Sequence, residues 1–239
     1  MTTTTAEDKI VSDYYMNRFE LFKIIFDKKD YSLAEEVCKF QYNDESLKTL
    51  ARVLFFDKKY ERAEILFKKL HMFAEYGYCR LYQNDKATAD KVWFSLKDTS
   101  PLIIWAKALS GYIEKRRTKE PSFFQIRNFY ETDLDTLLSL KMNTYAENLI
   151  NSIQYFADTN PEVYKYTGRV LYNHGYYDYA EKFLAAGKEI VWEDAELHFL
   201  DAEVRLAKHE KTTAIKSLEN ALEVSPSYYP AIKLLENIK

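Results

Sequence analysis

The 239-residue sequence is poor in the residues that turns, phosphate loops and disulfide frameworks need. It contains 5 glycines and 5 prolines, too few for a chain rich in hairpins or phosphate-binding loops. Its two cysteines, Cys38 and Cys79, cannot form a disulfide framework, and we expect free thiols in a reducing compartment. No apolar run approaches the roughly 20 residues that cross a bilayer. These shortages argue against secreted disulfide-rich, membrane-spanning and nucleotide-binding classes.

The charge balance and the N-terminal stretch exclude further classes of protein. The formal net charge is -3 and the isoelectric point is about 5.9, unlike a general nucleic-acid binder. The opening stretch, MTTTTAEDK, has no apolar segment of the kind a secretory signal needs. We therefore expect residues 1–8 to be a flexible tail on a nuclear or cytoplasmic protein that binds neither nucleic acid nor membrane.

What the sequence has in abundance is aromatic residues and internal repetition. It contains 20 tyrosines and 15 phenylalanines, and two stretches are almost the same: FDKKDYSLAEEV from Phe26 and FDKKYERAEILF from Phe56. Small residues also recur. Ala146, Ala180 and Ala214 are 34 residues apart, and a small residue stands twelve positions before two of them, at Gly168 and Ala202. Related units with shorter spacing place Ala51 before Ala63 and Gly77 before Ala89.

This spacing is typical of tetratricopeptide repeats, which are pairs of antiparallel helices with small residues at positions 8 and 20. The small residues let the two helices of a pair approach closely where they cross. We predict an all-α, right-handed superhelical solenoid that forms one domain over residues 9–239. The spacing is irregular near 101–122, where a helix is followed by a basic loop, and a division into two lobes there stays open.

Residues that could carry chemistry are scattered. None of the histidines, His71, His174, His198 and His209, has a metal-ligand spacing with the cysteines. There is no phosphate loop or nucleophile elbow, and the carboxylates are spread along predicted helix surfaces. We therefore expect a protein that is not an enzyme and needs no cofactor or metal. The basic run EKRRTKE at 114–120 is read either as a solvated helix end or as a nuclear-localisation or acidic-partner contact.

The repeat frame predicts which side chains line the concave groove of the solenoid. Helix A positions 2, 5, 9 and 12 face the groove in this architecture, and they carry aromatic residues and a few cations here. Such a groove suits a peptide or helix held by aromatic anchors, although some of these residues could simply pack on neighbouring repeats. The lysine and asparagine pattern of repeats that bind chaperone C-termini is incomplete. The predicted groove residues are Lys48, Arg52, Phe55, Tyr78, Leu81, Lys165, Arg169 and Tyr172.

Residues 31–82 resemble the opening of the tetratricopeptide scaffold subunits of the anaphase-promoting complex, and the later part, from Asp133 to Leu235, has the same character, so that the resemblance spans most of the chain. The similarity lies in a unit made by Leu50, Ala51, Phe55, Tyr60 and Ala63, followed by a shortened repeat of 26 residues. The resemblance implies a non-catalytic part of a ubiquitin-ligase scaffold that acts in cell-cycle control and forms homodimers through its N-terminal repeats. The chain would hold that dimerising part, and the activator-binding subunit is the preferred match. The alternative is a generic repeat adaptor for an unrelated partner.

The first predicted helical segment is a candidate for the homodimer interface. A terminal capping helix should be polar outside, whereas this segment is rich in aromatic residues. The alternative is that its apolar side covers the first repeat. The predicted interface residues are Tyr14, Tyr15, Phe19, Phe22 and Phe26.

Overall fold

The computed structural model describes residues 44–116, 118 and 120–238, and its packing divides the chain into two units, with the boundary between Lys97 and Asp98. The predicted tail, the first copy of the repeated stretch and Cys38 lie outside the described residues. The boundary falls just before the region in which the sequence left a division open. The single domain over 9–239 stays a prediction.

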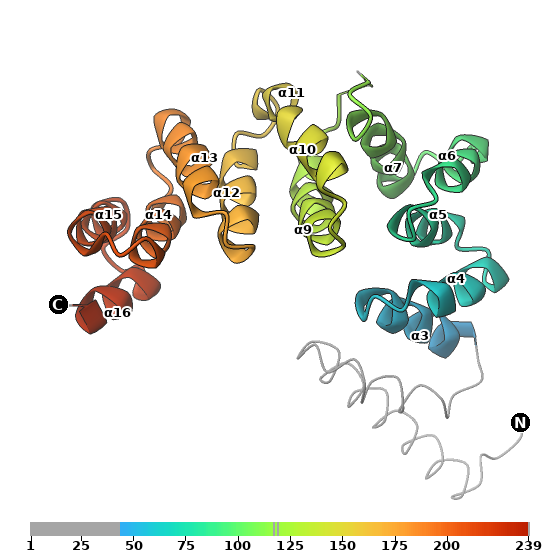
Figure 1. Ribbon diagram of the computed structural model, residues 1–239, viewed down its shortest axis with the longest axis horizontal. Helices are drawn as coiled ribbons and strands as arrows, with labels where there is room; N and C mark the ends of the chain where they lie inside the picture. Colours follow the sequence, from blue (N-terminus) through green and yellow to red (C-terminus); the bar gives the residue numbers. More distant parts are fainter. Residues whose placement is uncertain (1–43, 117, 119, 239) are drawn as a thin grey trace, which may run out of the picture. The chain divides into compact units, whose positions relative to one another are not determined.

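The described part of the first unit consists of two helix pairs (Figure 1). Within each pair the helices are joined by a short turn, and α4 also packs on α5. The apolar residues of all four helices form the interior of the unit. The pairs are α3 (Asp44–Phe56) with α4 (Tyr60–Lys69), and α5 (Phe73–Tyr82) with α6 (Lys86–Ser95).

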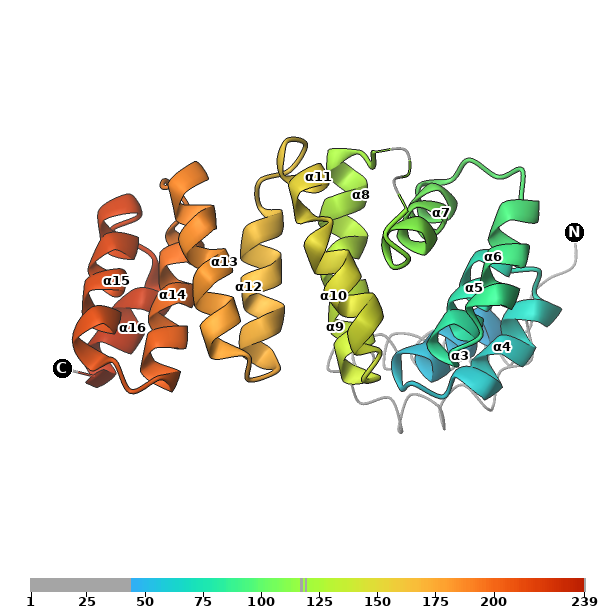
Figure 2. The same ribbon diagram turned by 45° about the horizontal axis from the view of Figure 1, so that its top comes forward.

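The second unit holds an irregular opening followed by regular pairs, and Figure 2 shows the later helices standing side by side. Its first helices are α7 (Pro101–Tyr112), α8 (Phe123–Gln125), the π-helical segment η1 (Ile126–Tyr130) and α9 (Glu131–Ser139). The next are α10 (Asn143–Asn151), α11 (Ile153–Ala157), α12 (Val163–Asn173) and α13 (Tyr177–Ile190). The last are α14 (Ala195–Ala207), α15 (Lys211–Val224) and α16 (Tyr229–Ile238).

The predicted fold class is confirmed: the described residues contain helices and no strand, arranged as antiparallel pairs of the tetratricopeptide type. The structure confirms that the small residues at positions 8 and 20 are closely packed. Those at position 20 are fully buried: Ala63, Ala89, Ala146, Ala180 and Ala214. A Cβ atom added at Gly77 would lie 2.2 Å from Trp93 Nε1, and one added at Gly168 would lie 2.5 Å from Leu184 Cδ2. In both repeats a large residue of the second helix therefore fills the space that glycine leaves on the first.

Many of the helices end in the same left-handed turn. The residue in that conformation is Gly175 after α12, with a φ of 78°, whereas other turns use lysine, histidine or asparagine. After α12 the amide of Tyr176 donates to the carbonyl of Leu171 at 2.8 Å, a bond that closes the turn and satisfies a terminal carbonyl. The non-glycine residues with φ between 57° and 64° are Lys58, His71, Asn84, Lys115, Lys141 and His209.

The irregular middle contains the two helices that the sequence predicts there. The first is α7, and the second runs from α8 through η1 into α9, with Leu134 fully buried at the position that usually carries a small residue. The π-helical turn and the break between α10 and α11 at Ser152 were not predicted. Glu114 and Arg116 of the basic run form an ion pair at 2.5 Å and are exposed; the functional alternatives for this run are untested.

A buried charge fixes α14 against both neighbouring helices. The Asp201 side chain is only 1% exposed, and its Oδ2 accepts from Ser217 of α15 at 2.6 Å and pairs with Lys188 of α13 at 2.9 Å. Arg205, one turn further along α14, also pairs with it at 2.9 Å. Burial raises the pKa of Asp201, but these three partners outweigh it and leave the pKa below its ordinary value. In the described residues no helix combines the length and apolar character needed to span a membrane.

Candidate functional site

Three of the predicted groove residues lie on one face of α12, the first helix of its pair. Lys165, Arg169 and Tyr172 are four and three residues apart, which places them one above the other on a helix. Helix α12 contacts the first helices of the neighbouring pairs, α9 and α14 (Figure 1). We call the row of partly exposed side chains on α9, α12 and α14 around these three residues the A face.

Lys165 is held by three carboxylates and is almost buried. Its side chain is 8% exposed, and its Nζ lies 2.6 Å from Asp194, 3.1 Å from Glu196 and 3.5 Å from Glu162. Burial lowers the pKa of Lys165, but the hydrogen bonds and charges of Asp194 and Glu196 outweigh it and raise the pKa above its ordinary value. Lys165 is therefore a charged, fixed part of the face, and it presents little surface of its own.

Arg169 connects three helices. Its Nη1 lies 3.2 Å from Glu131 on α9, and its Nη2 lies 2.8 Å from Glu196 on α14. Burial raises the pKa of Glu131, Arg169 lowers it, and the net pKa remains above the ordinary value. The guanidinium thus holds the first helices of successive pairs in register, with Nη1 and Nη2 both bonded to carboxylates of the chain itself.

Glu203 is the remaining charged residue of the A face. It lies on α14 and is half-buried, and among the described residues it makes no hydrogen bond or ion pair. Burial raises its pKa, and the charge of Arg169 lowers it only in part. A half-buried carboxylate in this state has lost some of its hydration without gaining a partner.

Aromatic side chains flank these charges. Tyr172 is half-buried against the core of the α12–α14 region, and its ring lies 5.9 Å from that of Tyr177. Phe199 of α14 packs edge-on against Tyr228 at 5.8 Å. Burial raises the pKa of Tyr172 and Tyr228, and the negative charge of Glu203 adds to both shifts, which places this carboxylate within electrostatic range of both phenols.

The predicted groove residues of the first unit are in a different position. Tyr78 and Leu81 are 5% and 0% exposed, because α5 is covered by aromatic side chains of the helices around it. Trp93 packs on Tyr78 at 5.1 Å, and Phe55 packs on Tyr82 at 5.8 Å. Tyr78 and Leu81 thus belong to the core of the first unit, which is the alternative that the sequence left open for these residues.

Residues on α3 remain nearer the surface. Lys48 is 39% exposed and lies 3.5 Å from Glu45, Arg52 is exposed, and Phe55 is half-buried in the aromatic cluster of the first unit. Their role in a groove stays a prediction. The five predicted interface residues, Tyr14, Tyr15, Phe19, Phe22 and Phe26, lie outside the described residues.

Sequence reasoning missed several members of the A face. The missed residues are Glu131, Glu196, Phe199 and Glu203, together with Asp194 and Tyr228 beside them. The signal for the first four was present: with Leu134 and Ala202 at position 8, they occupy positions 5, 2, 5 and 9 of their repeats. Asp194 and Tyr228 precede α14 and α16, where the positional rule makes no statement.

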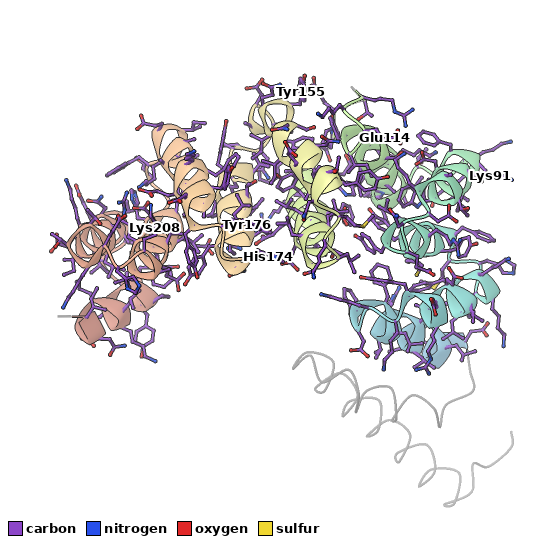
Figure 3. The ribbon with its side chains drawn as sticks, in the orientation of Figure 1. Lys91, Glu114, Tyr155, His174, Tyr176 and Lys208 are labelled. Atoms are coloured by element: carbon purple, nitrogen blue, oxygen red, sulfur yellow. The ribbon has the colours of Figure 1, made fainter. Side chains whose placement is uncertain are left out.

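One edge of the A face carries a second set of contacts between neighbouring pairs. Figure 3 labels His174 and Tyr176 beyond the end of α12, and Lys208 beyond the end of α14. His174 Nε2 lies 2.9 Å from Asp135 of α9, and Lys208 pairs with Asp178 at 2.9 Å. In each contact, the residue that follows a first helix binds a helix of the preceding pair. These contacts therefore help to fix the positions of the helices that carry the A face.

Across 44–116, 118 and 120–238, no three or more histidine, cysteine or acidic side chains are placed to hold a metal ion. His198 is fully buried, and its Nε2 lies 2.8 Å from the carbonyl of Trp192, as expected for a structural histidine. Cys79 is also buried, and burial raises the pKa of its thiol, which disfavours the reactive thiolate.

The chain is thus a helical repeat of the tetratricopeptide type in its fold. No family model and no curated protein matches it. Among solved structures it is similar to YrrB, described as a TPR protein with an unusual peptide-binding site, with 14% identity and a TM-score of 0.42, over 86% of this chain and 97% of that one.

Two further solved structures are similar. The Cut9–Hcn1 hetero-tetramer of APC/C shares 15% identity with a TM-score of 0.40, over 91% of this chain. The chain spans 41% of the length of that protein. A tetratricopeptide repeat protein from Parabacteroides merdae shares 18% identity with a TM-score of 0.38, over 94% of this chain and 98% of that one.

Proposed function

We propose that the chain is a non-catalytic scaffold for protein–protein interaction, and that it binds a segment of a partner protein along the A face. The observation that carries this proposal is the organisation of α9, α12 and α14. Arg169 fixes these three first helices to one another. Tyr172 follows it by one turn on α12, Phe199 lies on α14, and both aromatic side chains have part of their surface accessible. A rigid row of aromatic and charged side chains is the arrangement that holds a peptide with little loss of entropy.

Selection of short random peptides displayed on phage against the whole chain tests this proposal. We expect the selected peptides to lose affinity about tenfold or more for the Tyr172→Ala variant, because aromatic anchors dominate such interfaces. The matched control is Tyr179→Ala on α13, a tyrosine that is 59% exposed and lies away from the A face. Fluorescence anisotropy measures both affinities. The proposal fails if no peptide is selected, or if both variants bind the selected peptides as the natural chain does.

The finer proposal is that this scaffold belongs to the type found in the anaphase-promoting complex, a ubiquitin ligase of the cell cycle, and that it forms a homodimer. Its support is the sequence resemblance over residues 31–82 and the aromatic character of the segment that contains Phe19 and Phe22. A generic adaptor that binds an unrelated partner is the alternative, and it needs no self-association.

Light scattering after size exclusion, over a dilution series in the micromolar range, distinguishes the homodimeric scaffold from the generic adaptor. The anaphase-promoting type requires a stable dimer, which Phe19→Glu combined with Phe22→Glu should convert to a monomer, since a buried unpaired carboxylate is costly at an interface. The control is Glu219→Gln on the exposed side of α15. A monomer of the natural chain at every concentration would leave the generic adaptor.

A further inference from the structure

The A face carries more negative than positive charge. Lys165 and Arg169 are its two cations, and both are already paired with carboxylates. Five acidic side chains surround these two cations: Glu131, Glu162, Asp194, Glu196 and Glu203. A partner segment placed on this face therefore meets a surplus of acidic groups, which favours a cationic occupant over an acidic one.

Of these five acidic side chains, Glu203 is the one whose negative charge can pair with a cation of the partner. The other four carboxylates have a cation of the chain within hydrogen-bonding or ion-pair distance, whereas Glu203 has none among the described residues. A carboxylate that is already half-dehydrated loses less hydration on pairing than an exposed one, so a new ion pair there is more favourable than at the surface.

Apolar surface adjoins the same carboxylate. Phe199 lies one helical turn before Glu203 on α14 and packs on Tyr228 before α16, and the negative charge of Glu203 adds to the raised pKa of the half-buried Tyr172 phenol on α12. The acidic group thus has aromatic side chains on its own helix and on α12, the helix that packs against it. A guanidinium or ammonium group on a long aliphatic stem matches that setting, because the stem covers apolar surface and the head reaches the carboxylate.

We propose that the partner segment on the A face carries an arginine or lysine whose cationic head pairs with Glu203 and whose stem lies against Tyr172 and Phe199. This inference rests on the proposed function and adds the chemistry of the partner. An acidic segment is disfavoured by repulsion from the five carboxylates, and the phosphate backbone of a nucleic acid is disfavoured for the same reason.

The test uses the peptides selected on the whole chain, and it removes the charge of a basic residue in the peptide, the charge of Glu203, or both. In each selected peptide the basic residues are replaced one at a time by an uncharged analogue, citrulline for arginine or acetyl-lysine for lysine, which keeps the stem without the charge. We expect one replacement to weaken binding to the natural chain about tenfold, equal to about 1.4 kcal/mol. On Glu203→Gln, both forms of that peptide should bind with equal affinity, because the charge pair is the interaction that the cycle isolates. Glu219→Gln should retain the tenfold difference.

Two results would overturn the inference and leave the proposed function in place. The first is selection of peptides that require Tyr172 but contain no basic residue. The second is an effect of the uncharged analogue that has the same size on Glu203→Gln and on the natural chain. Failure to select any peptide would overturn the proposed function itself, and the inference with it.

The affinity of the arginine-containing peptide for the natural chain should also fall as salt is added, since part of the ion pair is exposed to screening.

Discussion

At the scale of single residues, Glu203 is a carboxylate whose ionised form the fold stabilises poorly. Its pKa is raised because burial removes hydration from the carboxylate and the charge of Arg169 compensates only in part. Below the ordinary pKa of glutamate, the group is protonated in both the folded and unfolded chain and has no effect on stability. Above the folded pKa it is ionised in both, and its ionised form is less favourable in the folded state.

The variant Glu203→Gln should therefore be more stable than the natural chain at neutral pH. We expect a gain of a few tenths to about 1 kcal/mol, the range typical of a partly buried polar change. The gain should disappear as the pH falls below the ordinary range of glutamate, where the natural carboxylate becomes neutral as well. Urea denaturation at pH 7 and in acid measures both values. Equal or lower stability of the variant at pH 7 would show that Glu203 is stabilising where it lies.

At the scale of helices, the sequence predicts those features that depend on spacing, and it misses those that depend on the neighbours. The small residues at Gly168 and Ala180 follow from a periodic pattern, and the structure confirms them at the crossing of α12 and α13. The burial of Tyr78 does not follow from its position in the repeat. It arises because Trp93 packs over it in a unit whose helices are short.

For the A face, too, the sequence predicts which residues share a helix surface but not how buried or paired they are. Lys165, Arg169 and Tyr172 could be placed on one helix surface from their spacing alone. That Lys165 is nearly buried depends on Asp194, which lies in the turn before another helix. That Glu203 has no ion-pair partner among the described residues could not be predicted either, because it depends on which carboxylates Arg169 and Lys165 contact in three dimensions.

The crossing of α12 and α13 gives a prediction at this scale. Gly168→Ala would place its Cβ 2.5 Å from Cδ2 and 2.6 Å from Cγ of Leu184, which is fully buried and cannot turn away. The clash should outweigh the higher helix propensity of alanine, with a net loss of about 1–3 kcal/mol. Thermal or urea unfolding measures the loss. Adding Leu184→Ala removes the clash, so the double variant should lose less than the sum of the two single variants; simple additivity would contradict this account.

At the scale of the whole molecule, the described helices pack mainly on those that adjoin them in the chain. Each unit has its own buried interior, and the boundary falls between Lys97 and Asp98. In repeat proteins of this kind, stability is close to a sum of local terms, so that one region can open while another stays folded.

A local change in the second unit should therefore have a local effect. In Gly168→Ala we expect amide hydrogen exchange to become faster in α12, α13 and α14, while protection in α5 and α6 stays close to that of the natural chain. Exchange measured by mass spectrometry on the full chain distinguishes the two regions, with Tyr179→Ala as a surface control. A uniform loss of protection from α5 to α15 would show instead that the two units unfold as one cooperative body.

The π-helical segment Ile126–Tyr130 has a consequence for how the length of this chain can vary. A π turn takes up one residue more than an α turn, which rotates α8 by about 100° relative to α9. Before the π turn, Gln125 donates to the carbonyl of Pro101 at 3.2 Å and so contacts α7; after it, Leu134 lies in the core beside the regular pairs. In evolutionary terms, this turn is a site where a single-residue insertion can be absorbed without a new loop, so related chains should differ in length here while their flanking helices keep the same neighbours.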